Sequence, residues 1–249
     1  MKSLRRFIEA FGEYLILMKD AFKRPQNRKV FARRIMFEMK ELGVDSIVIV
    51  TIVSVFVGAA VVMQILLNLD SPMYPNWIYG FVSRKAMMLE FSPTIISLIL
   101  AGKCASKIAS EIGTQRITEQ IDALEVMGVN TPSYLILPKV IACVVFFPIL
   151  GVISIFVALI GGQLGGFLIG TLTPFDYIEG LRLEFSMGDF YYAMVKLIIN
   201  ALIISSIACY RGYTIKGGSV EVGQQSTKAV VQSSIVIMIF NILITELFN

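Results

Sequence analysis

Residues 102–139 read GKCASKIASEIGTQRITEQIDALEVMGVNTPSYLILPK, a polar segment between two long apolar runs. So many charged side chains cannot lie in hydrocarbon, because the membrane interior offers them no water. The charged residues are Lys103, Lys107, Glu111, Arg116, Glu119, Asp122, Glu125 and Lys139. Gly128, with Pro132 four residues later, is a stop signal and predicts an ordered helix over about residues 114–127. We therefore expect a water-exposed helix between two membrane spans, which is a suitable docking point for a soluble partner.

The composition is that of a membrane protein. Of the 249 residues, 56% are hydrophobic and 16% are charged, whereas soluble domains carry about 25% charged residues. The apolar residues form long blocks, which predicts an all-α protein with several membrane-spanning helices. The net charge of +4 is too small to argue for nucleic acid binding. There is no His, and Cys104, Cys143 and Cys209 are scattered, so neither a metal site nor a disulfide framework is predicted.

Five apolar runs are long enough to cross a bilayer. They cover about residues 44–69, 81–101, 140–170, 190–210 and 229–248. Before them, segments 3–22 and 26–42 place apolar residues at helical spacing between charged ones, which predicts two amphipathic helices at the membrane interface. We therefore expect interfacial helices over residues 1–43 and a five-helix transmembrane domain over residues 44–249.

The distribution of basic residues predicts the orientation of the chain. Of 22 Lys and Arg, eleven lie in residues 1–43, four in residues 102–139 and three in residues 211–228. Cytoplasmic segments carry the excess of Lys and Arg, so these three segments are expected inside the cell. Five spans then place the N-terminus in the cytoplasm and the C-terminus outside.

The third span is rich in glycine and long enough to leave open whether it is one helix or two. Its glycines form overlapping pairs four residues apart, which are typical of close helix packing, and we favour this role over a flexible gate. They are Gly161, Gly162, Gly165, Gly166 and Gly170.

Three polar residues lie inside the spans. Glu90 stands three residues before Pro93, and a carboxylate in hydrocarbon costs roughly 2.5–3.5 kcal/mol. We favour a functional role for it, with a structural hydrogen bond at a proline kink as the alternative. Lys196 either reaches the outer interface or is functional, and the sequence leaves both open. Gln64 could line a pore, although a hydrogen bond between helices is favoured.

The predicted helix over residues 114–127 has an apolar stripe, formed by Ile117, Ile121 and Leu124. An acidic face lies beside it. Because the stripe would be exposed unless it packs on something, docking of a partner is favoured over a merely solvated helix. No phosphate-binding Gly-x-x-x-x-Gly-Lys-[Ser/Thr] loop occurs, and without His no Ser-His-Asp relay can form. The chain is therefore expected to have no catalytic residues and no ATP site of its own.

The run SEIGTQRITEQIDALEVMGVNTPSYLILPKV, residues 110–140, resembles the signature of the MlaE permease family, the membrane subunits of ABC-type lipid transporters. The resemblance implies that this helix is a coupling helix in a groove of a cytoplasmic ABC ATPase. The implied coupling residues are Glu111, Arg116, Thr118, Glu119, Asp122 and Glu125. It also implies a homodimer in the bacterial inner membrane, a central lipid cavity and a ring of periplasmic Mce-domain proteins. ATP would be bound by the partner, so this chain needs no cofactor.

The same resemblance implies a lipid site. Glu90 falls where the family has an acidic residue before a helix kink, and Lys196 falls at its basic position in the fourth span. Asn241 stands where some members have an acid, which departs from the pattern. Together with the apolar first span, the expected lipid-binding residues are Glu90, Gln64, Phe56, Val57, Val61 and Lys196.

The expected function is therefore that of a permease moving phospholipid between the inner membrane and a periplasmic carrier, driven by a separate ATPase. One alternative is an ion-coupled secondary transporter or channel that uses Glu90 and Lys196 as a relay. Another is a scaffold that tethers a lipid carrier to the membrane without transporting lipid.

Overall fold

The computed structural model describes residues 2–23, 27–68, 75–170 and 172–248, and these contain helices and turns but no strand. The chain divides into two compact units. Unit 1 comprises Met1–Val44, Leu100–Phe146 and Asn200–Ile239, and unit 2 comprises Asp45–Ile99, Phe147–Ile199 and Phe240–Asn249. Three long helices, α8, α10 and α11, contribute residues to both units.

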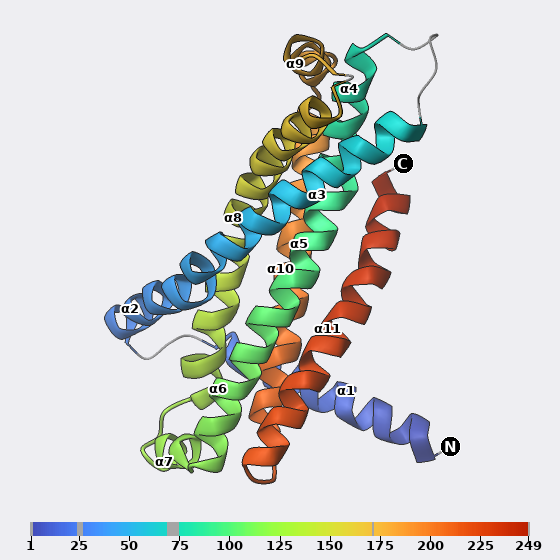
Figure 1. Ribbon diagram of the computed structural model, residues 1–249. Coiled ribbons are helices and arrows are strands. Elements are labelled where there is room, and N and C mark those ends of the chain that lie inside the picture. Colours follow the sequence, from blue (N-terminus) through green and yellow to red (C-terminus); the bar gives the residue numbers. More distant parts are fainter. Residues whose placement is uncertain (1, 24–26, 69–74, 171, 249) are drawn as a thin grey trace. The chain divides into compact units, whose positions relative to one another are not determined.

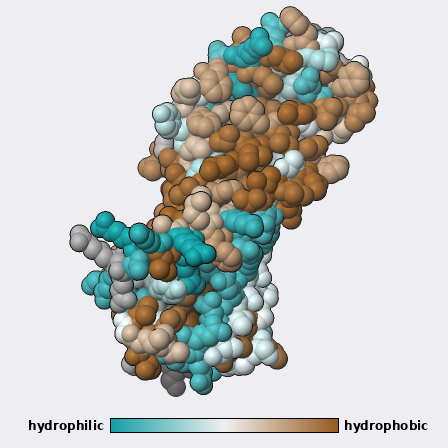
Figure 2. All heavy atoms as spheres, turned by 90° about the vertical axis from the view of Figure 1, so that its left-hand side faces the viewer, coloured by the Kyte–Doolittle hydropathy of each residue, from teal (hydrophilic) through white to brown (hydrophobic). Residues whose placement is uncertain are grey.

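Five helices in the described part of the chain are long and apolar enough to cross a membrane, and each covers all or nearly all of one of the five predicted spans. They are Arg28–Asn68, Trp77–Ile117, Thr131–Ile169, Met187–Tyr213 and Ser219–Leu247. The prediction of an all-α membrane protein with five spans is confirmed. Hydrophobic side chains make up much of the surface seen in Figure 2, as expected for helices surrounded by lipid.

Unit 1 contains the predicted amphipathic segments as helices α1 and α2, drawn in blue in Figure 1. Asn27 caps α2, because its side-chain oxygen accepts hydrogen bonds from the backbone N–H groups of Lys29 and Val30. Their position at a membrane surface stays a prediction. The helical elements wholly in unit 1 are α1 (Lys2–Ala21), α2 (Arg28–Glu38), two π-helical turns (Met39–Gly43 and Ala101–Ala105), α6 (Ser106–Ile117) and α7 (Gln120–Val126).

Unit 2 contains a helix that the sequence analysis missed. Residues 171–189, between the third and fourth apolar runs, were expected to form an outside loop, yet Pro174–Arg182 form α9. Thr173 caps this helix by accepting from the backbone N–H of Asp176 at 3.2 Å, with Pro174 at its first position. The other elements are α3 (Ile47–Asn68), α4 (Trp77–Ala86), a π-helical turn (Met87–Phe91) and α5 (Ser92–Leu100). The segment 70–80, between the first two apolar runs, was expected to form a turn. Residues 70–74 lie outside the described residues, and α4 already begins at Trp77, so the second half of this segment is mostly helical.

Helix α9 packs closely on α4. A Cβ atom at Gly80 would lie 2.2 Å from the carbonyl oxygen of Tyr177, so only glycine permits this approach. The Tyr177 hydroxyl lies 3.2 Å from that of Ser83. Burial raises the pKa of the Tyr177 phenol, which therefore stays protonated and able to donate at neutral pH.

The three long helices are α8 (Thr131–Ile169), α10 (Met187–Tyr213) and α11 (Ser219–Phe248). Helix α8 is continuous over 39 residues despite Pro138 and Pro148, so the third span is one helix. Helices α10 and α11 extend into the segment 211–228, which joins the fourth and fifth apolar runs and was expected to be an inside loop. Its polar residues lie mostly on helix ends, and only residues 214–218 connect the two helices.

The glycines of the third span provide close packing between α8 and α3 in unit 2. A Cβ atom at Gly161 would lie 2.2 Å from the carbonyl oxygen of Val55, and one at Gly165 would lie 2.9 Å from Cα of Ala59. The packing role is thereby confirmed at these positions. Gly170 differs, because it has φ +78° and ends α8 with open space around it.

We expect Gly161→Ala to destabilise the folded chain by about 1–3 kcal/mol, because the added methyl group would push α3 away from α8. Thermal unfolding in detergent measures the effect. Gly102→Ala is the matched control, since a Cβ atom at Gly102 has no neighbour within 4 Å. Equal unfolding temperatures for the two variants would contradict the packing role.

Candidate functional site

A cluster of polar side chains lies within the transmembrane helices of unit 2. Lys196 Nζ of α10 forms an ion pair with Glu90 Oε1 at 2.8 Å and contacts the Thr245 hydroxyl of α11 at 3.0 Å. The Lys196 side chain is fully buried, so it does not reach out to an interface. The sequence left this pairing open, and the structure brings the two predicted residues together.

The backbone around Glu90 explains why a cation is held here. Glu90 lies in the π-helical turn Met87–Phe91, and Pro93 follows it. Proline has no backbone N–H, so it cannot bond the carbonyl oxygen of Leu89, four residues earlier. That oxygen accepts instead from Lys196 Nζ at 3.0 Å. Lys196 thus donates hydrogen bonds both to the Glu90 carboxylate and to the Leu89 carbonyl oxygen that the proline leaves without its usual partner.

Tyr192 and Thr245 complete the cluster, and the sequence analysis missed both. The Tyr192 hydroxyl donates to Thr245 at 2.9 Å, and its ring lies 4.4 Å from Lys196 Nζ. The Thr245 hydroxyl lies 3.0 Å from Glu90 Oε1. A helical spacing of four residues relates Tyr192 to Lys196, and Thr245 to Asn241. This spacing is the signal that could have found them.

Asn241 does not contact the charged pair through its side chain. Its Nδ2 donates to the Thr94 hydroxyl at 3.1 Å, and its backbone carbonyl accepts from Thr245 at 2.8 Å. The amide therefore links α11 to α5 without adding charge to the cluster.

The contacts to Glu90 converge on one of its two carboxylate oxygens. Lys196 donates to Oε1, and the hydroxyl oxygens of Thr245 and Tyr192 lie 3.0 and 3.4 Å from the same atom, whereas no described residue is seen to bond to Oε2. The Glu90 side chain is 46% exposed, whereas that of Lys196 is 0% exposed. A polar group arriving from outside the chain therefore has an acceptor available at Glu90.

The other predicted lipid-binding residues do not join this cluster. Phe56 and Gln64 are exposed on α3, and Val61 is half-buried. The hydrogen bond to another helix that was favoured for Gln64 is not seen among the described residues.

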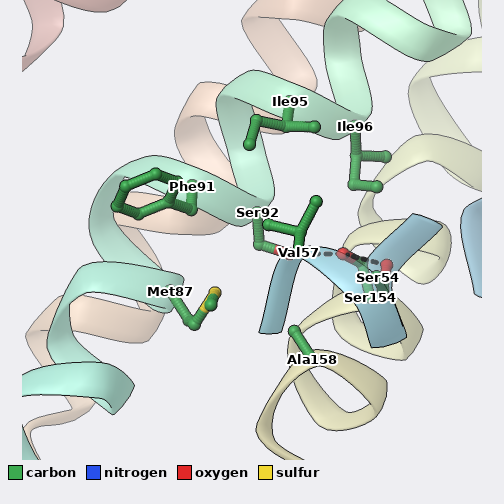
Figure 3. A pocket seen from close by; sticks show the side chains of 9 residues that line it. All are labelled: Ser54, Val57, Met87, Phe91, Ser92, Ile95, Ile96, Ser154 and Ala158. Atoms are coloured by element: carbon green, nitrogen blue, oxygen red, sulfur yellow. Dashed lines mark hydrogen bonds between the residues drawn. The ribbon is translucent and has the colours of Figure 1, made fainter. Parts of the chain in front are cut away.

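Val57 lines a small cavity in unit 2, shown in Figure 3. Three serines meet on one side of it. Ser154 lies between the other two, 2.9 Å from the Ser54 hydroxyl and hydrogen-bonded to Ser92. The cavity volume is about 10 Å³, room for one water molecule but not for a lipid.

The predicted coupling segment is two helices rather than one. Helix α6 ends at Ile117, and α7 begins at Gln120. The Thr118 hydroxyl donates to the carbonyl oxygen of Thr114 at 2.8 Å, and Glu119 has a left-handed backbone with φ 58°. The prediction of a single helix over residues 114–127 is therefore wrong, although Gly128 ends the segment with φ +77° as expected.

The six predicted coupling residues have different surroundings. Arg116 pairs with Asp122 at 2.6 Å, and Glu125 accepts from the hydroxyl groups of Thr131 and Tyr213 at 3.0 and 2.9 Å. Glu119 and Asp122 remain exposed. Glu111 instead points to a buried lysine, so it does not belong to the same surface as Asp122.

The apolar side chains of α7 are also placed differently from the expectation. Ile121 is fully buried within unit 1, and Ile117 and Leu124 are half-buried, so the chain itself covers most of the predicted stripe. Val126 and Met127 are 89% and 68% exposed. An exposed apolar pair beside Glu119 and Asp122 forms the surface that remains for a partner.

A second buried ion cluster lies in unit 1 and was not predicted. Lys139 Nζ lies 2.7 Å from Glu38 Oε1 and 2.7 Å from Glu111 Oε2. Lys139 is fully buried, Glu38 is nearly so, and Glu111 is 34% exposed. One cation of α8 thus holds the end of α2 and the middle of α6 together.

Comparisons with known proteins agree over nearly the whole chain. Residues 35–247 match the family described as permease MlaE. A probable ABC transporter permease protein of Rickettsia prowazekii is 33% identical over 98% of this chain and 93% of that protein. Proteins of the same description from Synechocystis and Pyropia yezoensis are each 30% identical, over 98% of this chain and 90% of theirs.

Proposed function

The chain belongs to the MlaE permease family, and from this premise we propose that it moves phospholipid between the inner membrane and a periplasmic Mce-domain carrier. It is an ABC transporter permease, and such a subunit works with a separate ATPase. The phospholipid, the Mce-domain partner and the homodimer belong to the proposal. So does the orientation, with the N-terminus in the cytoplasm and the C-terminus in the periplasm.

The observation that carries the proposal is the position of Glu90. A phospholipid needs apolar walls for its tails and polar groups for its headgroup. In unit 2 the half-exposed Glu90 carboxylate has one oxygen held by Lys196, Thr245 and Tyr192. The lipid headgroup donates an N–H or O–H to the other oxygen, while its tails contact exposed apolar residues such as Phe56.

The enclosed cavity in unit 2 is too small for a lipid. The pocket beside Val57 holds about one water molecule, so a lipid does not fit inside it. In the proposal, a second copy that faces the first forms the other wall of a lipid cavity, as expected for the MlaE permease family.

The exposed part of α7 is the proposed contact with the ATPase. The sequence has no Gly-x-x-x-x-Gly-Lys-[Ser/Thr] loop, so ATP is bound by the partner and this chain needs no cofactor. Val126 and Met127 supply apolar contact area, and the acidic side chains beside them supply charge complementarity. ATP hydrolysis in the partner then moves α7 and drives lipid transfer.

We expect Glu90→Gln to slow lipid transfer about tenfold, because a charged acceptor for the headgroup becomes neutral at a cost of about 1.5 kcal/mol. The variant keeps the shape of the side chain and its contact with Lys196. The assay uses the permease reconstituted with its ATPase and carrier, and follows fluorescent phospholipid. Glu246→Gln, an exposed carboxylate on α11, is the control.

Unchanged transfer by Glu90→Gln would argue against a headgroup site at this cluster and would favour a non-transporting scaffold. Transfer that follows an imposed proton gradient and ignores ATP would favour the ion-coupled alternative, in which Glu90 and Lys196 form a relay.

A further inference from the structure

One face of α2 lines an open groove in unit 1. Val30, Arg33, Arg34 and Phe37 follow each other at intervals of three, one and three residues, which places them on the same side of the helix. The opposite wall is Tyr134 of α8, and the groove has a volume of about 320 Å³. We call it the α2 groove.

The charges in the α2 groove are arranged in two layers. At the rim, Arg33 is exposed and forms no ion pair with a described residue, and the Arg34 guanidinium lies 4.4 Å from the centre of the Tyr134 ring. The floor is formed by Glu38 and Glu111, which Lys139 holds from beneath. Three cations thus face two carboxylates, and one positive charge is left without a counter-charge.

The length of the first helical segment identifies where this groove lies. Arg28–Asn68 is 41 residues long, about twice the 20 residues that a helix needs to cross the hydrocarbon core, so the 22 residues of α3 are enough to cross it without α2. Helix α2 carries four of its eleven residues as Arg or Lys, so it belongs at headgroup level. Val30 and Phe37 are exposed on either side of the arginines.

We propose that the α2 groove binds the headgroup of an anionic phospholipid of the surrounding membrane. The phosphate lies at Arg33 and Arg34 and neutralises the surplus positive charge. Hydroxyl groups of the headgroup donate to the carboxylate oxygen of Glu111 that Lys139 does not hold. Val30 and Phe37 contact the acyl chains, which a soluble phosphate lacks. The site is separate from the cluster at Glu90 and does not depend on lipid being the transported substrate.

The headgroup chemistry follows from the accessible charges. Glu38 is nearly inaccessible, and Glu111 is 34% exposed. The groove therefore presents less accessible negative charge than the positive charge of its two arginines. Phosphatidylglycerol has one negative charge and two hydroxyl groups on its headgroup. Its phosphate neutralises the surplus positive charge, and its hydroxyl groups donate to Glu111. Phosphatidylcholine has no net charge and no hydroxyl group on its headgroup, so it leaves the surplus charge and Glu111 unmatched.

The test uses the full chain in nanodiscs of phosphatidylglycerol and phosphatidylcholine in equal amounts. After extraction into detergent, native mass spectrometry counts the phospholipid that stays bound to each chain. We expect Arg33→Gln with Arg34→Gln to retain at least tenfold less phosphatidylglycerol than the unchanged chain. The matched control, Arg28→Gln with Lys29→Gln, removes the same charge from α2 outside the groove and is expected to change retention less than twofold.

Equal losses in the two double variants would overturn the proposal, because they would show only general attraction to a negative surface. Equal retention of phosphatidylcholine and phosphatidylglycerol would also overturn it. Glu246→Gln, which changes an exposed carboxylate outside both sites, is expected to retain as much phosphatidylglycerol as the unchanged chain. A loss caused by Glu90→Gln but not by the Arg33 and Arg34 double variant would assign the bound phosphatidylglycerol to the Glu90 cluster and overturn the proposal. If the Arg34 variant unfolds, Arg33→Gln alone must still lose phosphatidylglycerol, since Arg33 is exposed and forms no ion pair with a described residue.

Discussion

Lys139→Met is expected to destabilise the folded chain by roughly 3–5 kcal/mol, the typical cost of removing one partner from a buried ion pair. Lys139 is fully buried and is the cation seen to hold both Glu38 and Glu111 among the described residues. Without it, Glu38 is left as a buried carboxylate with no cation in hydrogen-bonding contact. Chemical unfolding in detergent, followed by tryptophan fluorescence or circular dichroism, measures the change.

Two variants separate charge from packing. Lys139→Met together with Glu38→Gln is expected to recover part of the lost stability, because no buried carboxylate then remains without its cation at position 38. Lys107→Met is the matched control, since Lys107 also pairs with a glutamate, Glu41, but both side chains are 35% exposed. Such a pair is worth about 1 kcal/mol or less. Equal effects of Lys107→Met and Lys139→Met would refute the buried-cluster explanation.

Glu119→Lys with Asp122→Lys is expected to weaken association with the ATPase by more than about a hundredfold. Each reversal replaces attraction by repulsion at an interface, and like charges brought together there cost several kcal/mol in all. Both side chains are exposed, so the helices themselves should still form. Pull-down of the ATPase from detergent extracts measures association, and the amount of folded permease in the membrane is measured in parallel.

The charge-matched control is Glu179→Lys with Glu246→Lys, two exposed carboxylates in unit 2. It changes the net charge by the same amount and should leave the pull-down unchanged. If both double variants lose the ATPase equally, or if neither does, then α7 is not the docking element.

The spans were predictable because a membrane helix is defined by local composition. A long apolar run is enough to identify a span, and Gly128 marked the end of α7 equally well. Helix α9 was missed because it is too short and too polar for that signal. The capping sequence Thr173-Pro174-Phe175-Asp176 could have revealed it.

The ion clusters were not predictable, because they depend on register between helices that are far apart in sequence. Glu90 and Lys196 are 106 residues apart, and Lys139 and Glu38 are 101 apart. Hydropathy marks Glu90 and Lys196 as charged residues inside apolar runs, but it does not say which partner they meet. The break at Glu119 is another case, since nothing in a Thr-Glu-Gln sequence requires a left-handed residue.

The ion pair in unit 2 has a consequence for the choice of cargo. Glu90 and Lys196 carry opposite charges, and Tyr192, Thr245 and Asn241 are neutral, so the cluster as a whole has no net charge. A neutral set of donors and acceptors discriminates weakly between zwitterionic and acidic headgroups. Selectivity among phospholipids is therefore expected to come from tail length and unsaturation, or from the carrier that receives the molecule.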